Sequence, residues 1–411
     1  MGLQRCLLIL WLAVAAAQGS EGPWWPQFHG PRRDNISDDR GLLKEWPPGG
    51  PKLLWKFSEC GRGFSNVAIA EGKLFLTGDF GPDEYVIALS LGGKLLWRTK
   101  NGRSWRGATP GARTTPTYDD GRLYQLNPTD RLVALDAHSG KELRALDLKE
   151  KFQARFGIWA MAENLVIDGQ RLFCVPGGRK GRIVALDKET GEVIWANTEI
   201  DDTAAYCSPT IAIHNGTKQL ITLMSKHIVS VAVEDGRLLW THPHRTLADQ
   251  NVTSPLYHTG YVLATSGHGT GGRLLRIAPD SRSVSEAWFN KEFDNCHGGV
   301  VLLDGHLYGS GCRLYKKGLV VVDFRTGKTT STNRPIGKVS ITYADGMLYC
   351  LDQKGWVMLV EPRPGGCRIV SKFRIPIESR DLPLSHPVVC GGRLYIRHAQ
   401  NLFVYSLRPE L

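Results

Sequence analysis

The fold is decided by the stretch VALDKETGEVIW, residues 184–195, in which an apolar run ends at Asp187, turns at Gly191 and resumes toward Trp195. Alternating apolar residues on both sides of an Asp/Gly turn are typical of a β-hairpin. A second clear copy of this hairpin pattern lies at residues 132–140. The stretch is therefore one unit of a repeat, and the rest of the chain can be aligned to it.

A second recurring phrase, Gly-Arg-Leu-Tyr or a close variant, precedes this hairpin and sets the period. The central apolar residue of its eight copies stands at positions 74, 123, 172, 220, 262, 307, 348 and 394. Steps of 41–49 residues match the length of a β-propeller blade. Each unit has room for four short strands, and no stretch shows a long helical period. The sequence therefore predicts an all-β protein, an eight-bladed β-propeller of four-stranded antiparallel blades.

The last unit is incomplete, which predicts how the ring closes. It ends near residues 401–407 and lacks the fourth strand that carries a Trp in other units. The missing strand stands at the other end of the chain, where PKLLW at residues 51–55 matches GKLLW at residues 93–97. We expect this first strand to complete the C-terminal blade, because a closed ring removes the exposed sheet edges of an open array.

The beginning of the chain has the pattern of a secretory signal peptide. Arg5 precedes an apolar run that ends in three alanines at residues 15–17, and the run is too short to span a bilayer. Cys6 lies before this run rather than after it, which disfavours bacterial lipidation. We therefore expect an exported protein, periplasmic or extracellular, monomeric and without a transmembrane segment. The predicted division is a signal peptide at 1–17, an N-terminal extension at 18–50, the propeller at 51–407 and a tail at 408–411.

Composition and charge narrow the class of partner. The chain has 51 Lys and Arg against 40 Asp and Glu, a formal net charge of +11, and 42% hydrophobic residues, which is ample for a core. A basic surface attracts anionic ligands or acidic partners. We expect no nucleic acid as a partner, because the chain is predicted to be exported and has no recognised binding motif.

The repeat resembles the pyrroloquinoline quinone (PQQ)-like β-propeller repeat. Quinoprotein alcohol dehydrogenases and the scaffold lipoprotein of the bacterial outer-membrane β-barrel assembly machine share this repeat, and the resemblance covers nearly the whole chain after the signal peptide. The opening WPQFHGPRRD, residues 25–34, also resembles the start of a large exported bacterial subgroup, with His29 where that subgroup usually has Arg.

This resemblance implies two main functions. The first is a binding or scaffold propeller in the bacterial envelope, with an envelope protein or a small anionic or sugar ligand as its partner. The second is a PQQ-dependent alcohol dehydrogenase that also holds Ca²⁺. The chain has no adjacent cysteine pair and no haem motif, both used by enzymes of that family, so we expect no cofactor and favour the first function. A hydrolase or lyase is the weakest alternative, because no paired-carboxylate motif occurs.

Tryptophans fall into two groups. Five recur near the end of the predicted fourth strand, which predicts packing between blades; these are Trp55, Trp97, Trp195, Trp240 and Trp288. Trp105 and Trp159 break this register and lie in loops, which makes them better candidates for a functional surface.

The candidate binding site is the channel mouth, where the inner strands begin. Small polar residues recur at these strand entrances, among them Asn66, Thr115 and Ser208. They either satisfy backbone groups at the strand ends, which is the more common use, or contact a ligand. The candidate ligand-binding residues on this rim are Arg113, Arg155, Trp159, Asn164, Tyr206 and His297.

His297 is also the candidate catalytic residue. It lies in Asn-Cys-His-Gly-Gly, residues 295–299, which resembles an N-H-H-G-G phrase of the exported subgroup with Cys296 in the middle. The two glycines let the backbone expose the imidazole to the channel, where it can act as acid, base or ligand. A purely structural hydrogen bond is the more common use of such a histidine.

Cysteine spacing gives two candidate disulfides and no metal site. Cys296 with Cys312 and Cys350 with Cys367 are the nearest pairs, although buried thiols that act as small apolar groups explain the pattern equally well. No C-x-x-C occurs. We therefore expect no zinc site.

Overall fold

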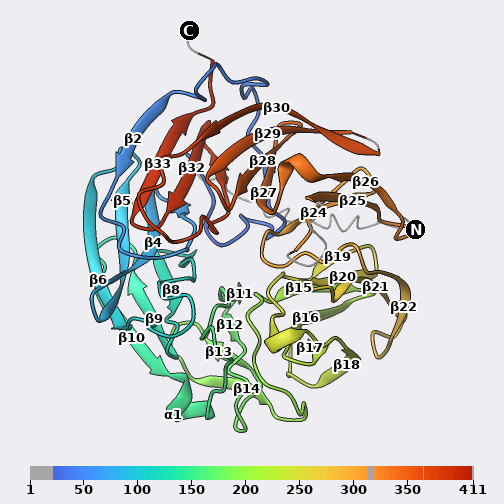
Figure 1. The fold of residues 1–411 in the computed structure, drawn as a ribbon. Helices are drawn as coiled ribbons and strands as arrows, with labels where there is room; N and C mark the ends of the chain where they lie inside the picture. Colours follow the sequence, from blue (N-terminus) through green and yellow to red (C-terminus); the bar gives the residue numbers. More distant parts are fainter. Residues whose placement is uncertain (1–21, 313–317, 364, 410–411) are drawn as a thin grey trace, which may run out of the picture.

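The structure, a computed structural model, describes residues 22–312, 318–363 and 365–409. Eight sheets are arranged as blades around a central axis (Figure 1), and each contains four antiparallel strands. In seven blades these four strands are consecutive in the chain, whereas in the eighth one strand comes from the beginning of the chain. The predicted fold is therefore confirmed. The predicted signal peptide at residues 1–17 lies outside the described residues. In the part of the chain that is described, none of the helices has the length and apolar character needed to cross a bilayer.

In seven blades the four strands follow one another in the chain from the channel outward, and in blade 8 the outermost strand comes from the beginning of the chain. Blades 1 and 2 contain β3 (Ala68–Ala70), β4 (Lys73–Phe80), β5 (Asp83–Ser90), β6 (Leu95–Arg103), β7 (Thr117–Asp119), β8 (Arg122–Leu126), β9 (Arg131–Asp136) and β10 (Glu142–Asp147). Blades 3 and 4 contain β11 (Val166–Asp168), β12 (Arg171–Cys174), β13 (Ile183–Asp187), β14 (Val193–Asn197), β15 (Thr210–His214), β16 (Thr217–Leu223), β17 (His227–Ala232) and β18 (Leu238–Pro243).

The other four blades have the same arrangement. Blades 5 and 6 contain β19 (Leu256–His258), β20 (Tyr261–Ser266), β21 (Gly271–Ile277), β22 (Val284–Asn290), β23 (Val300–Leu303), β24 (His306–Ser310), β25 (Leu319–Asp323) and β26 (Thr329–Asn333). Blades 7 and 8 contain β27 (Val339–Ala344), β28 (Met347–Asp352), β29 (Trp356–Arg363), β30 (Gly366–Arg374), β31 (Val388–Cys390), β32 (Arg393–His398), β33 (Asn401–Ser406) and β2 (Leu53–Phe57). In the described part of the chain, three short helical segments lie in connections: α1 (Leu148–Phe152), η1 (Leu247–Asp249) and η2 (Arg334–Ile336).

The apolar positions that define the repeat are core positions of the propeller. Each of the eight aligned apolar residues lies in the second strand of its blade and is at most 1% exposed. Both faces of a blade are covered by its neighbours, so apolar side chains from adjacent blades form shared clusters. This burial explains why the repeat is visible in the sequence.

The ring closes as predicted, with strands from the two ends of the chain in one blade. β2 pairs antiparallel with β33, and Phe57 lies opposite Leu402; Figure 1 shows the blue β2 beside the red β33. A buried arginine in β32, Arg397, strengthens the junction with blade 1. Its guanidinium donates to the carbonyl oxygen of Thr77 at 2.6 Å and to that of Gly61 at 3.2 Å. The closure therefore rests on a shared sheet and on a buried polar contact.

The recurring tryptophans lie between blades. Trp195 donates from Nε1 to the Val233 carbonyl oxygen of the next blade at 3.0 Å. Its ring covers Gly236, where a Cβ would lie only 2.4 Å from the indole. The same contact with a turn glycine of the next blade is made by the pairs Trp55 and Gly93, Trp97 and Gly140, and Trp288 and Gly327. These tryptophans are therefore packing residues.

The N-terminal extension lies across the channel, which the sequence does not predict. We call residues 25–37 the plug. Its Arg33 donates to the carbonyl oxygen of Leu165 in blade 3 at 3.0 Å, while Asn35 accepts from the Tyr343 backbone in blade 7 at 2.8 Å. Blades 3 and 7 face each other in a ring of eight, so the plug crosses the axis. Its last residues form β1 (Ile36–Ser37), a fifth strand parallel to β27.

Candidate functional site

A cavity of about 700 Å³ opens at the end of the channel where the inner strands begin. Every blade contributes a residue that precedes its inner strand: Phe64, Arg113, Trp159, Tyr206, Val252, His297, Lys338 and Leu384 in order from blade 1 to blade 8. The plug contacts the inner strands further along, for example at Ile69 and Tyr118. We call this space the mouth cavity; the plug lies across the axis beyond it.

Four of the six predicted binding residues line the mouth cavity: Arg113, Trp159, Tyr206 and His297. The structure thus brings together residues from blades 2, 3, 4 and 6 that are far apart in the sequence. They present a guanidinium, two aromatic rings and an imidazole to one space.

Arg113 is fixed by backbone carbonyl groups. Its Nη2 donates to the Thr109 oxygen at 2.6 Å, and its Nη1 donates to the carbonyl oxygen of Trp159. Burial lowers the pKa of this guanidinium to about 10, while the carboxyl groups of Asp79 and Glu84 act in the opposite direction. Arg113 therefore stays charged at neutral pH and contributes a fixed cation to the wall.

Trp159 and Tyr206 form an aromatic corner of the cavity. Their ring centroids are 5.7 Å apart with an edge-to-face angle of 79°, an arrangement that favours contact between aromatic quadrupoles. Such a corner offers flat apolar surface to a ring or a sugar.

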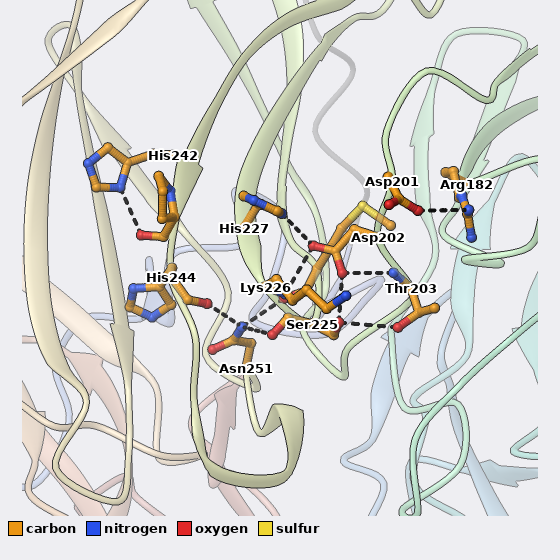
Figure 2. A network of polar contacts seen from close by, with 12 residues as sticks. Arg182, Asp201, Asp202, Thr203, Ser225, Lys226, His227, His242, His244 and Asn251 are labelled. Atoms are coloured by element: carbon orange, nitrogen blue, oxygen red, sulfur yellow. Dashed lines mark hydrogen bonds and ion pairs between the residues drawn. The ribbon is translucent and has the colours of Figure 1, made fainter.

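Figure 2 shows a polar network around Asp202 and Asn251, and the backbone of Asn251 is hydrogen-bonded to that of Tyr206. The buried Asp202 carboxylate accepts from Ser225 Oγ at 2.6 Å. Asn251 donates from Nδ2 to the Met224 carbonyl oxygen at 2.7 Å. The backbone carbonyl oxygen of Asn251 accepts from the Tyr206 backbone N–H at 3.0 Å. The backbone of Tyr206 is therefore positioned by the strand connections of blade 4 rather than left to a mobile loop.

His297 is half-buried at the wall of the cavity. Burial lowers its pKa well below the ordinary value, and the nearby charge of Lys338 and the ring of His386 lower it further. The imidazole is therefore neutral at neutral pH. A neutral ring can accept a hydrogen bond or ligate a metal, but it is a poor proton donor, which narrows the roles expected from the sequence.

Two predicted binding residues do not reach the mouth cavity. Arg155 is exposed and lines a separate, smaller pocket with Phe156 and Asp249. Its backbone N–H donates to the Pro176 oxygen at 2.8 Å, which turns this part of the loop away from the mouth. Asn164 is buried, and its side chain is occupied by hydrogen bonds within the propeller.

Asn164 belongs to a relay of hydrogen bonds that passes from blade to blade at the strand entrances. The backbone N–H of His386 donates to Asn66 Oδ1 at 3.0 Å, and that of Asn66 donates to Thr115 Oγ1 at 3.0 Å. The N–H of Thr115 donates to Asn164 Oδ1 at 2.6 Å, and that of Asn164 donates to Ser208 Oγ at 2.9 Å. These polar residues satisfy backbone groups, the more common of the two uses considered from the sequence.

The sequence reasoning missed two basic residues of the cavity. Arg334 and Lys338 line it from the connection that enters β27. The rule that selected the other residues, position just before an inner strand, would have found them in blade 7. Among the described lining residues there is no Asp or Glu, so the cavity is cationic and aromatic.

The two candidate disulfides differ in geometry. The sulfur of Cys296 lies within 4.8 Å of the Cys312 sulfur, but Cys296 is a free thiol in the structure. The Cys296–Cys312 disulfide therefore stays a prediction. Cys350 and Cys367 lie in β28 and β30, which are separated by β29. Strands two positions apart are about 10 Å apart, beyond the roughly 7 Å between Cα atoms that a disulfide spans. The second pairing therefore does not fit this blade.

The ring of blades and the mouth cavity define a closed eight-bladed propeller with a basic, aromatic cavity at one end of its channel. A family model described as outer membrane protein assembly factor BamB matches residues 82–333, more than half of the chain. The chain therefore belongs to the PQQ-like β-propeller family that this model represents.

Relatives in this family have different functions. BamB of Shewanella oneidensis is 23% identical over 274 residues, which cover 62% of this chain and 65% of that protein. Quinohemoprotein alcohol dehydrogenase ADH IIB of Pseudomonas putida is 34% identical over 100 residues, 24% of this chain and 14% of the enzyme. The chain thus spans less than two thirds of either relative.

Solved structures share the fold at low sequence identity. BamB of Moraxella catarrhalis has a TM-score of 0.62 at 15% identity, with 87% of this chain and 98% of that chain covered. Quinohemoprotein alcohol dehydrogenase ADHIIG of Pseudomonas putida has a TM-score of 0.61 at 10% identity, with 94% and 82% covered. Both structures support the eight-bladed architecture.

Proposed function

We propose that this protein is a binding propeller of the bacterial envelope that takes a small anionic ligand with a flat ring at the mouth cavity. The observation that carries the proposal is the lining itself: Arg113, Arg334 and Lys338 are cationic, Trp159 and Tyr206 are aromatic, and no described lining residue is acidic. A volume of about 700 Å³ lies within the usual range for small-molecule sites. The envelope location is supported by relatives named as outer membrane protein assembly factors.

The alternative, PQQ-dependent alcohol oxidation with Ca²⁺, fits this lining poorly. Ca²⁺ takes six to eight oxygen ligands, of which carboxylates are the usual charged ones. The described lining supplies no carboxylate and therefore lacks the charged oxygen ligands that Ca²⁺ usually takes. A quinone that carries carboxylates would match the cations and the aromatic corner as a bound anion.

A scaffold role is the second candidate and is favoured by the match to the BamB family model. Outer strands of several blades expose paired apolar side chains, for example Leu95 and Leu96 in β6, and Val193 and Ile194 in β14. In-cell cross-linking would test this role. A scaffold should be recovered with outer-membrane assembly proteins, and an Arg334→Ala change in the mouth cavity should leave that recovery unchanged.

The binding proposal is tested with 8-anilinonaphthalene-1-sulfonate (ANS), a flat fluorescent sulfonate, and with PQQ, each titrated with and without Ca²⁺. We expect one saturable site for ANS, competition by PQQ, and no gain in affinity from Ca²⁺. Arg334→Ala should weaken ANS binding about tenfold, the cost of a 1.4 kcal/mol loss. Arg282→Ala, a change at an exposed arginine outside the cavity, is the matched control.

Two results would contradict this proposal. Equal ANS affinity in the Arg334 and Arg282 variants would place the site elsewhere. PQQ binding that requires Ca²⁺ and is followed by alcohol-dependent reduction of a dye would favour the quinoprotein alternative. Near-ultraviolet circular dichroism must show native packing in each variant, because ANS also binds partly unfolded proteins.

A further inference from the structure

Three metal-ligating side chains come together on one wall of the mouth cavity. One ring nitrogen of His268 and the sulfur atoms of Cys296 and Cys312 all lie within 4.8 Å of one another. All three residues line the cavity, the two cysteines being buried and His268 half-buried. Ligand atoms around a tetrahedral Zn²⁺ are about 3.8 Å apart, given Zn–S bonds near 2.3 Å. Small side-chain movements would therefore complete a metal-binding geometry.

The three groups reach this wall from separate connections in blades 5 and 6. His268 lies in the hairpin between β20 and β21, Cys296 precedes β23, and Cys312 follows β24. No two of them are close enough in sequence to form a metal motif such as C-x-x-C. This separation explains why the sequence predicts no metal site.

Gly267 leaves room for the cluster. A Cβ at this position would lie 2.7 Å from Cys312 Sγ and 2.9 Å from Cys296 Cβ, closer than real Cβ contacts. Any other residue here would therefore fill the space between the sulfur atoms or move them. The glycine is needed for close approach rather than for an unusual backbone angle.

The buried Asp294 carboxylate ties the connections together. Its Oδ1 accepts from the Cys312 backbone at 2.9 Å, and its Oδ2 accepts from the Gly269 backbone, next to His268, at 3.2 Å. One side chain thus positions the segments that carry two of the three groups. Such outer partners orient metal ligands in known sites. Lys338 Nζ lies 3.7 Å from Cys312 Sγ, on the same wall of the cavity.

We propose that His268, Cys296 and Cys312 bind a thiolate-preferring transition metal ion, of which Zn²⁺ is the reference case. Thiolate and imidazole ligands are those that select such ions over Ca²⁺ or Mg²⁺. Among the described residues no further His, Cys, Asp or Glu joins the cluster. The fourth position therefore faces the mouth cavity and takes water or a cavity ligand, as in sites with three protein ligands.

Metal binding and the predicted Cys296–Cys312 disulfide exclude each other. The metal needs both sulfurs as thiolates, so binding releases the thiol protons, whereas oxidation joins the same two sulfurs in one bond. The metal site therefore belongs to the reduced protein. Thiol counting before each titration establishes which form is present.

The test uses the full chain, purified reduced and free of metal, and titrated with Co²⁺ and then Zn²⁺. We expect one Co²⁺ per chain with thiolate-to-cobalt charge-transfer absorption, the visible bands of tetrahedral Co²⁺, and displacement by Zn²⁺. Cys296→Ser, Cys312→Ser and His268→Ala should each weaken binding by more than the roughly 10–100-fold cost of losing an outer partner. Cys367→Ser, at a half-buried thiol in blade 7, is the matched control.

Gly267→Ala keeps all three ligands but fills the space between them, and should also abolish the charge-transfer absorption. This variant keeps the test decisive if a cysteine variant does not fold. Absence of the absorption in the reduced parent chain would overturn the proposal, as would equal Co²⁺ affinity in the Cys296→Ser and Cys367→Ser variants. The readout does not involve ANS or PQQ, so its result is independent of the proposed ligand.

Discussion

His29 of the plug lies with its Nε2 3.2 Å from Nδ1 of His386, at the entrance to the inner strand of blade 8. Nε2 of His386 lies 2.7 Å from the carbonyl oxygen of His297, which lines the mouth cavity. A carbonyl oxygen only accepts, so His386 carries its proton on Nε2 and accepts from His29 on Nδ1. The plug and the cavity wall are thus joined through one buried imidazole.

This imidazole should make the stability of the fold depend on pH. Burial lowers the pKa of His386 to about 4, against an ordinary value near 6.5. Between these values the unfolded chain binds a proton that the folded chain does not, so stability is lost as the pH falls from 6.5 toward 4. At pH 5 this one group should cost about 2 kcal/mol.

The measurement is the free energy of unfolding at pH 7 and pH 5 for the parent chain and for His386→Gln, which cannot titrate. We expect the parent chain to lose about 2 kcal/mol more than the variant between the two pH values. His138→Gln, at an exposed histidine, is the control and should follow the parent. Parallel losses in the parent and the His386 variant would contradict the neutral, buried imidazole.

A side chain at Gly299 should destabilise the fold because the plug passes beside this position. Its φ is +76°, and a Cβ would lie 2.5 Å from Asn35 Nδ2 and 3.0 Å from His386 Cε1. Gly299→Ala should lower the free energy of unfolding by about 3 kcal/mol, the sum of backbone strain and overpacking. Gly72→Ala is the matched control, since Gly72 has a φ of +70° and open space around its missing Cβ. Equal losses in a denaturant titration would show that the plug does not press on this position.

Two truncated chains should separate the contribution of ring closure to stability from that of the plug. A chain that begins at residue 44 lacks the plug but keeps β2, whereas one that begins at residue 58 lacks both. We expect the first to fold with a lower melting temperature, and the second to melt still lower and to self-associate, because β33 becomes an exposed edge. Calorimetry and light scattering measure the two effects. Identical melting of the two truncated chains would disprove closure by β2.

Cavity residues and packing residues should separate in binding and stability measurements. Trp159→Ala and His297→Ala should each weaken ANS binding about tenfold or more while changing the free energy of unfolding by less than about 1 kcal/mol. Trp195→Ala should cost about 3–5 kcal/mol but leave the ANS affinity of the folded protein unchanged. If the Trp159 and His297 variants are as unstable as the Trp195 variant, the mouth cavity is not a binding site.

The sequence predicted the parts of the structure that repeat. The aligned apolar residues, such as Leu74 and Leu394, recur because each is buried at the same place between blades. The last unit lacks a fourth strand, and this absence similarly predicted that residues 51–55 pair with the last unit. Trp195 was recognised as a packing residue for the same reason, because a tryptophan recurs at the equivalent position of five blades and a recurring position contributes to the packing between blades.

The sequence by itself determined the propeller and the end of the channel that bears the candidate site, because strand patterns are local and the ring then brings equivalent ends to one axis. Only the tertiary structure decided that Arg155 turns away, that Lys338 faces the cavity, and that the plug crosses the channel. It also decided that Cys296 and Cys312 lie beside His268. Loop side chains are oriented by contacts with residues that are distant in the sequence, and local sequence patterns do not predict those contacts.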